Sequence, residues 1–475
     1  MPNNLWTLAA LADACQGDVS GSPPQSFGGV SIDSRSVSKD DVFVAIKGDT
    51  LDGHDFVPVA IANGAGIAIV SRLNSDWSTN LPLIVVKDDP LAALERLGRA
   101  ARKRSHGKII AVTGSVGKTS TKEMLRVALS ASAETHASAA SFNNHWGVPL
   151  TLSRFAETSG FGVFEIGMNH PGEITPLVDM VRPHIAIVTN VAASHLGHFS
   201  SLDGIADAKS EIFTGVVKGG HAIINRDSAH FEHLKLAAQK AGITHIHSFG
   251  KHAEADVKLE AVALRPDCCC ITAVLFGERV TYKLGVPGEH MALNSLAVLA
   301  ACKLAGADLA RAALALADAK PAKGRGGQIK LSTGQGSILL LDESYNANPA
   351  SVAAAFSLLG TLKPGKVGRR VAVLGDMLEL GDFGPDLHRD LAAGISANGI
   401  DLVFTAGPLM RHLYDVIPPA KRCFHAEQAV ALVDVLKSTL RSGDCVMIKG
   451  SLGSRMGPVV EALKAHWPVV IEEAV

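Results

Sequence analysis

The chain has 475 residues, a length that predicts three domains at about 150 residues each. Hydrophobic residues make up 47% of the chain and charged residues 19%, which is typical of compact globular proteins and excludes a mainly disordered chain. The net charge of −1 creates no field that would attract nucleic acid, so an anionic ligand must be held by a few well-placed residues.

The N-terminus and the apolar segments give no sign of export or of membrane insertion. The apolar residues 8–11 follow no basic region and are soon followed by Asp13, so they do not resemble a signal peptide. No run of 18 apolar residues occurs, and we expect no membrane span. The seven cysteines include an adjacent triplet at 268–270 and show no CxxC spacing. This usage predicts buried, reduced thiols in a cytoplasmic protein rather than a zinc site.

The order of apolar strands and helical segments predicts an α/β fold in three domains. Residues 1–104 are predicted to form a small N-terminal α/β domain, with strands at 43–46 and 66–70. Residues 105–327 repeat strand, loop and helix, which is typical of a mostly parallel sheet with crossover helices. The strands expected in this central domain are 109–112, 162–166, 185–189 and 222–224, with a β-rich insertion at about 254–285.

Residues 328–475 repeat the same alternation and are predicted to form a Rossmann-like C-terminal domain. No GxGxxG motif follows a strand in this region, so a bound dinucleotide is not indicated. The strands expected here are 338–341, 371–374, 402–405 and 446–448.

The segment after the strand at 109–112 is the most informative part of the chain. Glycines there let backbone N–H groups converge on phosphate oxygens, Lys118 supplies a positive charge, and Thr119 offers a hydroxyl to Mg²⁺. The usual P-loop has a glycine where this chain has Val112, so the TGxxGKT form is typical of a narrower group of ATP-binding enzymes. The predicted ATP-binding loop consists of Thr113, Gly114, Ser115, Val116, Gly117, Lys118, Thr119 and Ser120.

Three polar residues further along the chain are candidates for the same site. Glu165 ends a predicted strand, where a carboxylate often binds a metal that bridges phosphates, although a surface or capping role explains it as well. His195 follows the next strand, close to His198, and an isolated histidine is often purely structural. Lys209 lies on a predicted helix, where an exposed, solubilising lysine is the simpler interpretation.

Three later segments carry further candidates. Asn294 lies on a long alanine-rich helix and has an amide that can read the edge of a base. Arg325 lies in a glycine-rich joint, where its guanidinium fork suits phosphate oxygens and where an ordinary flexible hinge is the alternative. The segment DESYNANP clusters carboxylates and amides before a helix start more densely than a turn requires; its candidate residues are Tyr345, Asn346 and Asn348.

Taken together, these segments resemble the Mur ligase family. The resemblance extends over almost the whole chain, from Asp33-Ser34-Arg35 to Lys449-Gly450-Ser451. The segments that carry it are TGSVGKT, FNNHWGVPLTL, FEIGMNHPGEI, NVAASHLGHF, AKSEIF, INRD, GEHMALNSLAVLA, DESYNANP and VLGDMLELG.

The resemblance implies a three-domain amide ligase that closes its domains around its substrates. We expect a monomer in the cytoplasm. ATP would phosphorylate the terminal carboxylate of UDP-N-acetylmuramoyl-tripeptide, and the amine of D-alanyl-D-alanine would attack the acyl phosphate. The products would be ADP, phosphate and a pentapeptide. The N-terminal domain would hold the uridine nucleotide, the central domain ATP, and the C-terminal domain the dipeptide.

The resemblance also implies roles for individual residues. Lys118, His195, Lys209 and Arg325 would be catalytic, and Asn294 would contact adenine. Two Mg²⁺ sites are implied, one at Thr119 and Glu165 and one near His195 and a carbamate (N6-carboxylysine) on Lys209. Tyr345, Asn346 and Asn348 would border the nucleotide. The UDP-substrate site would comprise Ser34, Arg35, Asn143 and Asn144.

Alternatives within and outside the family are separated by particular segments. The sister ligase that adds the third residue usually carries DNPR in its last domain, whereas this chain has 375–381, GDMLELG, in that region. Folate-type polyglutamyl ligases carry DGAHNP-like loops in place of DESYNANP. Met291 and Glu343 depart from the asparagine and aspartate common in the family. A nucleotide-binding scaffold without catalysis remains the alternative of a different class.

Overall fold

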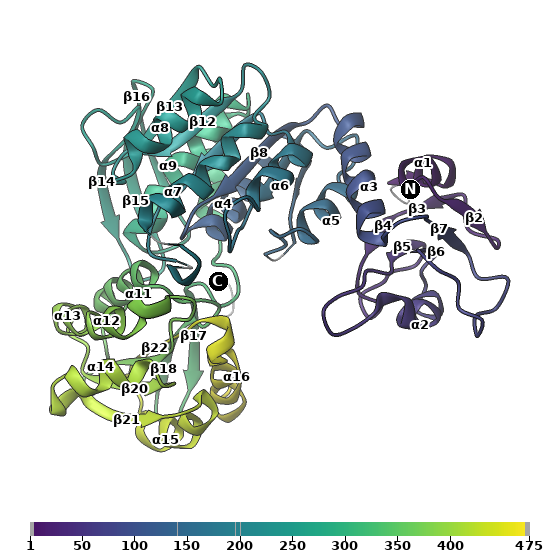
Figure 1. Cartoon of the computed structure of the whole chain (residues 1–475). Coiled ribbons are helices and arrows are strands. Elements are labelled where there is room, and N and C mark those ends of the chain that lie inside the picture. Colours follow the sequence, from purple (N-terminus) through teal and green to yellow (C-terminus); the bar gives the residue numbers. More distant parts are fainter. Residues whose placement is uncertain (1–3, 140, 195, 200, 471–475) are drawn as a thin grey trace.

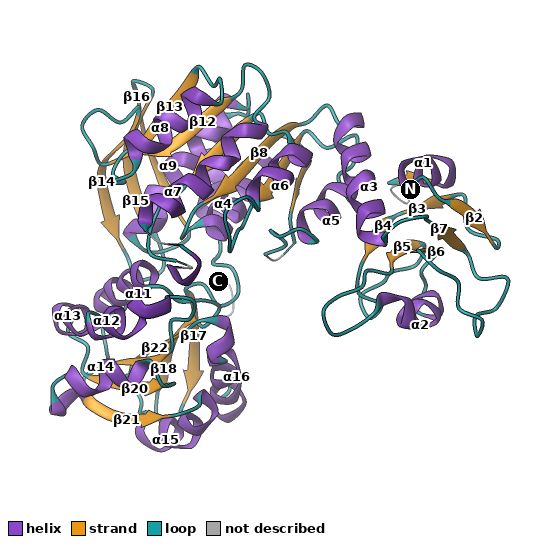
Figure 2. Cartoon of the chain, viewed as in Figure 1, coloured by secondary structure: helices purple, strands orange, loops and turns teal. Residues whose placement is uncertain are grey.

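The computed structural model describes residues 4–139, 141–194, 196–199 and 201–470, and three main β-sheets follow one another along the chain (Figures 1 and 2). Helices cover the sheets, so the predicted α/β class is confirmed. Within these ranges, no helix combines the length and the apolarity needed to cross a bilayer.

The first sheet has five strands in the order β2-β7-β6-β5-β4, parallel except for β2. The separate strands β1 and β3 pair beside it. The strands are β1 (Trp6–Thr7), β2 (Asp18–Ser20), β3 (Ser26–Phe27), β4 (Gly29–Ser31), β5 (Asp41–Val44), β6 (Ile67–Val70) and β7 (Leu83–Val85). The helices are α1 (Leu8–Cys15), α2 (Val57–Ala62) and α3 (Pro90–Arg104).

Helix α3 connects this first sheet to the rest of the molecule. It packs against α5 (Gly147–Ser153), and Gly98 allows the close approach because a Cβ there would lie 3.2 Å from the backbone oxygen of Pro149. The Trp6 indole donates a hydrogen bond to the Ser153 carbonyl (2.8 Å). Figure 1 shows the first sheet at one end of the molecule, beyond α3 and α5.

The second sheet has nine strands in the order β16-β15-β14-β13-β12-β11-β8-β10-β9. Neighbours are parallel from β9 to β14, and β14, β15 and β16 are antiparallel, which confirms the predicted β-rich insertion. The strands are β8 (Lys108–Thr113), β9 (Thr135–Ala137), β10 (Phe161–Glu165), β11 (Ile185–Val188), β12 (His221–Asn225), β13 (His245–Gly250), β14 (Val257–Leu264), β15 (Cys269–Leu275) and β16 (Glu278–Leu284).

Two apolar cores lie on opposite faces of this sheet because the inner strands are apolar on both sides. The core on one face includes α4 (Lys118–Ser130), α9 (Glu289–Leu304) and α10 (Leu309–Ala315). The core on the other face includes α5, α6 (Ile174–Val181), α7 (Leu202–Ser210) and α8 (Phe231–Lys240).

The third sheet has the order β17-β18-β22-β19-β20-β21 and is parallel except for β17. It too has a core on each face. The strands are β17 (Gly327–Ser332), β18 (Ser337–Glu343), β19 (Arg370–Gly375), β20 (Leu402–Ala406), β21 (Arg422–Ala426) and β22 (Cys445–Lys449). The helices are α11 (Pro349–Thr361), α12 (Gly384–Arg389), α13 (Leu391–Ala397), α14 (Met410–Val416), α15 (Leu432–Thr439) and α16 (Met456–His466).

The cysteines correct one expectation. All seven are free thiols, as predicted, but Cys270 is exposed and Cys423 is only half-buried. The reason is strand alternation, because Cys269 on β15 points into the core and its neighbour Cys270 points to solvent.

Candidate active site

The phosphate loop connects β8 to α4 and is held tightly by its surroundings. A Cβ at Gly114 would collide with the Thr189 hydroxyl, and a Cβ at Gly117 would lie 2.6 Å from the Asn294 amide nitrogen. Gly117 also has φ +86, a conformation that L side chains rarely adopt. The loop therefore needs glycine at both positions, and it places the N-terminus of α4 beside Asn294 of α9.

Lys118 lies at the first position of α4, where its ammonium group reaches back over the loop. Nζ donates a hydrogen bond to the Gly114 carbonyl (2.6 Å). Burial lowers the pKa of Lys118, the Arg325 charge lowers it further, and the Glu165 carboxylate opposes both. A cation in this position can bind an anion that is brought to the loop.

Glu165 lies at the end of β10, in the parallel strand beside the one that leads into the phosphate loop. It is 1% exposed, and its Oε1 accepts a hydrogen bond from Asn143 Nδ2 (2.7 Å). Its Oε2 is buried without a hydrogen-bond partner. The Thr119 hydroxyl lies 3.5 Å from that of Ser141 and shares a cavity with Glu165. An orphaned carboxylate oxygen beside a hydroxyl fits a Mg²⁺ ligand set.

Lys209 is buried near the end of α7, which rules out the interpretation as an exposed, solubilising lysine. It is 2% exposed, and burial together with the nearby Lys118 charge holds its pKa well below the ordinary value. Its ammonium group makes no hydrogen bond or ion pair with another described residue. His195, predicted to act near it, lies outside the described residues.

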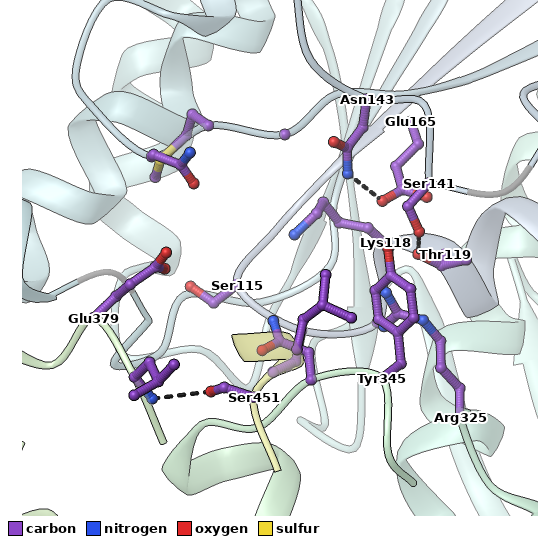
Figure 3. A pocket seen from close by; sticks show the side chains of 18 of the residues that line it. Ser115, Lys118, Thr119, Ser141, Asn143, Glu165, Arg325, Tyr345, Glu379 and Ser451 are labelled. Atoms are coloured by element: carbon purple, nitrogen blue, oxygen red, sulfur yellow. Dashed lines mark hydrogen bonds between the residues drawn. The ribbon is translucent and has the colours of Figure 1, made fainter. Parts of the chain in front are cut away.

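Two adjoining cavities lie between the second and third sheets. The phosphate-side cavity, about 290 Å³, is shown in Figure 3 and contains Ser115, Lys118, Thr119 and Glu165. The adenine-side cavity, about 220 Å³, contains Asn294 and Asn348. Several predicted residues line both cavities: Ser115, Val116, Gly117, Arg325 and Asn346. The structure thus brings together most of the predicted ATP-binding residues, including Tyr345 on the phosphate side and Ser120 on the adenine side.

Arg325 and Tyr345 lie together at the joint between the two sheets, where Arg325 lines both cavities and Tyr345 lines the phosphate-side one. The guanidinium carbon of Arg325 lies 4.3 Å from the centre of the Tyr345 ring, and Tyr345 N donates to the Gly324 carbonyl (3.1 Å). The stacked ring restricts the guanidinium, so Arg325 is presented to the cavities in a defined direction.

One residue of the adenine-side cavity that the sequence did not single out is Lys449. Lys449 at the end of β22 is 2% exposed and donates to the Glu343 carboxylate (3.2 Å) and the Asn346 carbonyl (3.0 Å). The Asn348 side-chain oxygen caps α11 by accepting a hydrogen bond from Ser351 N (2.9 Å). This oxygen is therefore already engaged within the protein. The signal for Lys449 is its place at the C-terminal end of a parallel strand, opposite Glu343.

The predicted UDP-substrate residues do not lie together in one cavity. Arg35 is exposed and forms a bidentate pair with Asp33, which lowers the pKa of Asp33 to about 2. Ser34 is buried beside it in the first sheet's domain. Asn143 instead contacts Glu165, and the Asn144 side-chain oxygen accepts from Gly147 N at the start of α5 (2.9 Å). Their assignment to the uridine nucleotide stays a prediction.

Gly197 of the central domain contacts the C-terminal domain at Gly381. Gly197 N donates to the Glu379 carbonyl (2.9 Å), and a Cβ at Gly381 would lie 3.0 Å from Gly197 Cα. Gly381 also has φ +57. A side chain at Gly381 would therefore push the segment 376–381 away from Gly197 and strain its backbone.

Replacing Gly381 by alanine is expected to lower kcat by roughly 10- to 100-fold, because the loop shifts away from the reacting groups. The control is Gly334→Ala, since Gly334 has φ +79 but no atom within 4 Å of a Cβ. Steady-state kinetics of both variants test the contact. Equal kcat values for the two variants would show that the contact between Gly197 and Gly381 does not affect catalysis.

Three family descriptions match successive parts of the chain. They are "Mur ligase family, catalytic domain" for residues 26–103, "Mur ligase middle domain" for 112–302, and "Mur ligase, glutamate ligase domain" for 329–452.

Similar proteins match nearly the full length. The UDP-N-acetylmuramoyl-tripeptide–D-alanyl-D-alanine ligase of Escherichia coli is 35% identical over 463 residues, covering 97% of this chain and 98% of the relative. MurF from Acinetobacter baumannii superposes with a TM-score of 0.83 at 31% identity, covering 97% and 99%. MurF from Thermotoga maritima, solved in complex with ADP, superposes with a TM-score of 0.74 at 26% identity, covering 92% and 97%. The chain belongs to the Mur ligase family.

Proposed function

We propose that the chain is an ATP-dependent ligase that joins D-alanyl-D-alanine to UDP-N-acetylmuramoyl-tripeptide and releases ADP and phosphate. The observation that carries the proposal is the phosphate-side cavity, where Lys118 and Glu165 of the central domain face Arg325 and Tyr345. The names of the full-length relatives supply the substrates. The reaction completes the pentapeptide of a peptidoglycan precursor.

The three domains divide the substrates among them. Residues 1–104 hold the uridine nucleotide with Ser34 and Arg35, residues 105–327 hold ATP, and residues 328–475 hold the dipeptide. The relative solved in complex with ADP supports nucleotide binding. The enzyme works in the cytoplasm, as a monomer that closes around its substrates.

The phosphate loop and Lys118 bind the β- and γ-phosphates, and Asn294 contacts adenine. Thr119 and Glu165 hold one Mg²⁺, which fits the orphaned Glu165 Oε2. A carbamate on Lys209, assisted by His195, holds a second. Burial lowers the pKa of Lys209, which favours the neutral form that reacts with CO₂. The metal ions supply charge neutralisation for phosphoryl transfer.

The reaction brings two anions together, the tripeptide carboxylate and the γ-phosphate of ATP. A carboxylate is a poor electrophile until its oxygen becomes part of a good leaving group, and the γ-phosphoryl group provides one. Lys118 and Arg325 offset the negative charge as the tripeptide carboxylate approaches the phosphate. The cavity between domains then excludes water from the acyl phosphate until the dipeptide amine attacks.

Asn143→Ala is expected to raise the Mg²⁺ concentration needed for half-maximal turnover by roughly 10- to 100-fold. The amide of Asn143 orients Glu165 through the 2.7 Å hydrogen bond, and the freed carboxylate would bind metal less well. Magnesium titration of the steady-state rate measures the change. An unaltered magnesium requirement would contradict the role of Glu165 as a ligand.

The test of the proposed function is phosphate release from ATP, measured with each peptide substrate alone and with both together. Sustained release only with both substrates supports the ligase. Sustained release with single amino acids in place of the dipeptide would favour the sister ligase. Nucleotide binding without turnover would favour a scaffold.

A further inference from the structure

A loop of the C-terminal domain, residues 376–381, forms part of the wall of the phosphate-side cavity. Leu378 and Glu379 of this loop line the cavity. Leu378 N donates a hydrogen bond to the hydroxyl of Ser451, which lines the same cavity (2.9 Å, Figure 3). The proposed reaction needs this wall in place, because water must be kept from the acyl phosphate.

His388 of α12 binds the backbone of this loop although it does not line the cavity itself. Its Nε2 lies 3.0 Å from Met377 N, and its Nδ1 lies 2.6 Å from the Gly384 carbonyl oxygen. A carbonyl oxygen can only accept, so Nδ1 carries the proton, and Nε2 must be unprotonated to accept from Met377 N. The side chain is 0% exposed, so water cannot replace either hydrogen bond. Only one neutral tautomer of His388 therefore satisfies both contacts.

The surroundings of His388 favour this neutral form. Burial lowers its pKa, the Gly384 carbonyl and the Asp376 carboxylate oppose that shift, and His412 of α14 adds to it. Helix α13, which also packs against α12, carries no charged side chain. The other charged groups of α12 and its neighbours are exposed: Asp382, Asp386, Arg389, Asp390, Arg411 and Asp415.

We propose that His388 is a positioning residue that fixes the loop 376–381 at the phosphate-side cavity only while its imidazole is neutral. This inference rests on the proposed function. The side chains of Met377 and Leu380 already anchor the loop in an apolar core, but apolar contacts have no direction. The hydrogen bond from Met377 N to His388 supplies the direction, and so it sets where the cavity wall lies.

Protonation of His388 would break this contact. A second proton would place an N–H group at Nε2 against the N–H of Met377, and the hydrogen bond would be lost. In an opened loop the histidine would have its ordinary pKa of 6.5, whereas burial lowers the pKa in the closed one. Opening is therefore favoured as the pH falls below 6.5.

The first test compares His388→Leu, which has no acceptor, with His388→Gln, whose amide oxygen can accept from Met377 N and cannot gain a proton. At about pH 8, His388→Leu should lower kcat by roughly 10- to 100-fold, and His388→Gln should restore most of the rate. The KM for ATP should be unchanged in both variants, because the loop does not line the adenine-side cavity. A parental kcat in His388→Leu would overturn the inference.

The pH profile gives a result that does not depend on the leucine variant. As the pH falls from about 8 to about 5.5, the parent should lose activity more steeply than His388→Gln. The control is His466→Gln, which replaces an exposed histidine of the same domain and should keep the parental profile. Identical acid limbs in the parent and His388→Gln would overturn the role of protonation.

Hydrogen exchange reports the loop without any turnover. The amides of 376–381 should exchange roughly 10-fold faster in His388→Leu than in the parent, while those of the phosphate loop, 113–120, stay unchanged. Parental protection in His388→Leu would overturn the inference and leave the ligase function intact. A parent enzyme that makes no pentapeptide would overturn the proposed function whatever the exchange shows.

Discussion

Lys118→Ala is expected to lower kcat by roughly 10²- to 10³-fold, because one preorganised cation is lost from the site where phosphate charge develops. The change should leave the fold intact because Lys118 belongs to no apolar core. The hydrogen bond that is lost, from Nζ to the Gly114 carbonyl, is local to the loop. Single-turnover rates of ADP formation measure the effect on the first chemical step.

The matched control is Lys108→Ala, which removes an exposed lysine at the opposite end of the same strand, β8. This variant should retain the parental rate. If Lys118→Ala and Lys108→Ala had similar rates, Lys118 would not contact the transferred phosphoryl group.

Lys209→Ala is expected to lower kcat by a similar factor of roughly 10² or more, because the carbamate proposed as a metal ligand could not form. Added short-chain carboxylates should restore part of the rate by occupying the space of the carbamate. Absence of rescue at any carboxylate concentration would argue against carbamylation. A parental rate in the unrescued variant would remove Lys209 from the mechanism.

Without a carbamate, Lys209 should destabilise the folded state. Its pKa is held well below the ordinary 10.5, so the unfolded chain binds a proton that the folded chain binds poorly. The penalty is therefore greatest at low pH and disappears as the pH rises toward 10.5. In CO₂-depleted buffer, Lys209→Met should raise the Tm by about 2–4 °C for each kcal/mol gained. A Tm gain that grew with pH would contradict this account.

The fold was largely predictable because its strongest signals are local. The strands at β8, β10, β11 and β12 are short apolar runs followed by polar turns, and they lie where the sequence predicted them. The strands β13 and β21 were missed because their sequences, HIHSFG and RCFHA, mix polar and apolar residues.

The candidate site was predictable in its parts but not in its contacts. The phosphate loop is continuous in sequence, and so its residues were identifiable together. The bond between Asn143 and Glu165 joins residues 22 positions apart, and the seating of Gly197 on Gly381 joins two domains. Neither pairing leaves a local pattern. The position of Glu379 over the phosphate loop depends on that same domain contact.

The central claim is that a dipeptide is joined to a nucleotide-linked tripeptide at the cavity between the second and third sheets. The most direct measurement is the mass of the uridine-nucleotide product after incubation with ATP, UDP-N-acetylmuramoyl-tripeptide and D-alanyl-D-alanine. The account predicts the mass of the pentapeptide, formed in step with ADP. A tripeptide recovered unchanged, or one extended by a single amino acid, would contradict it.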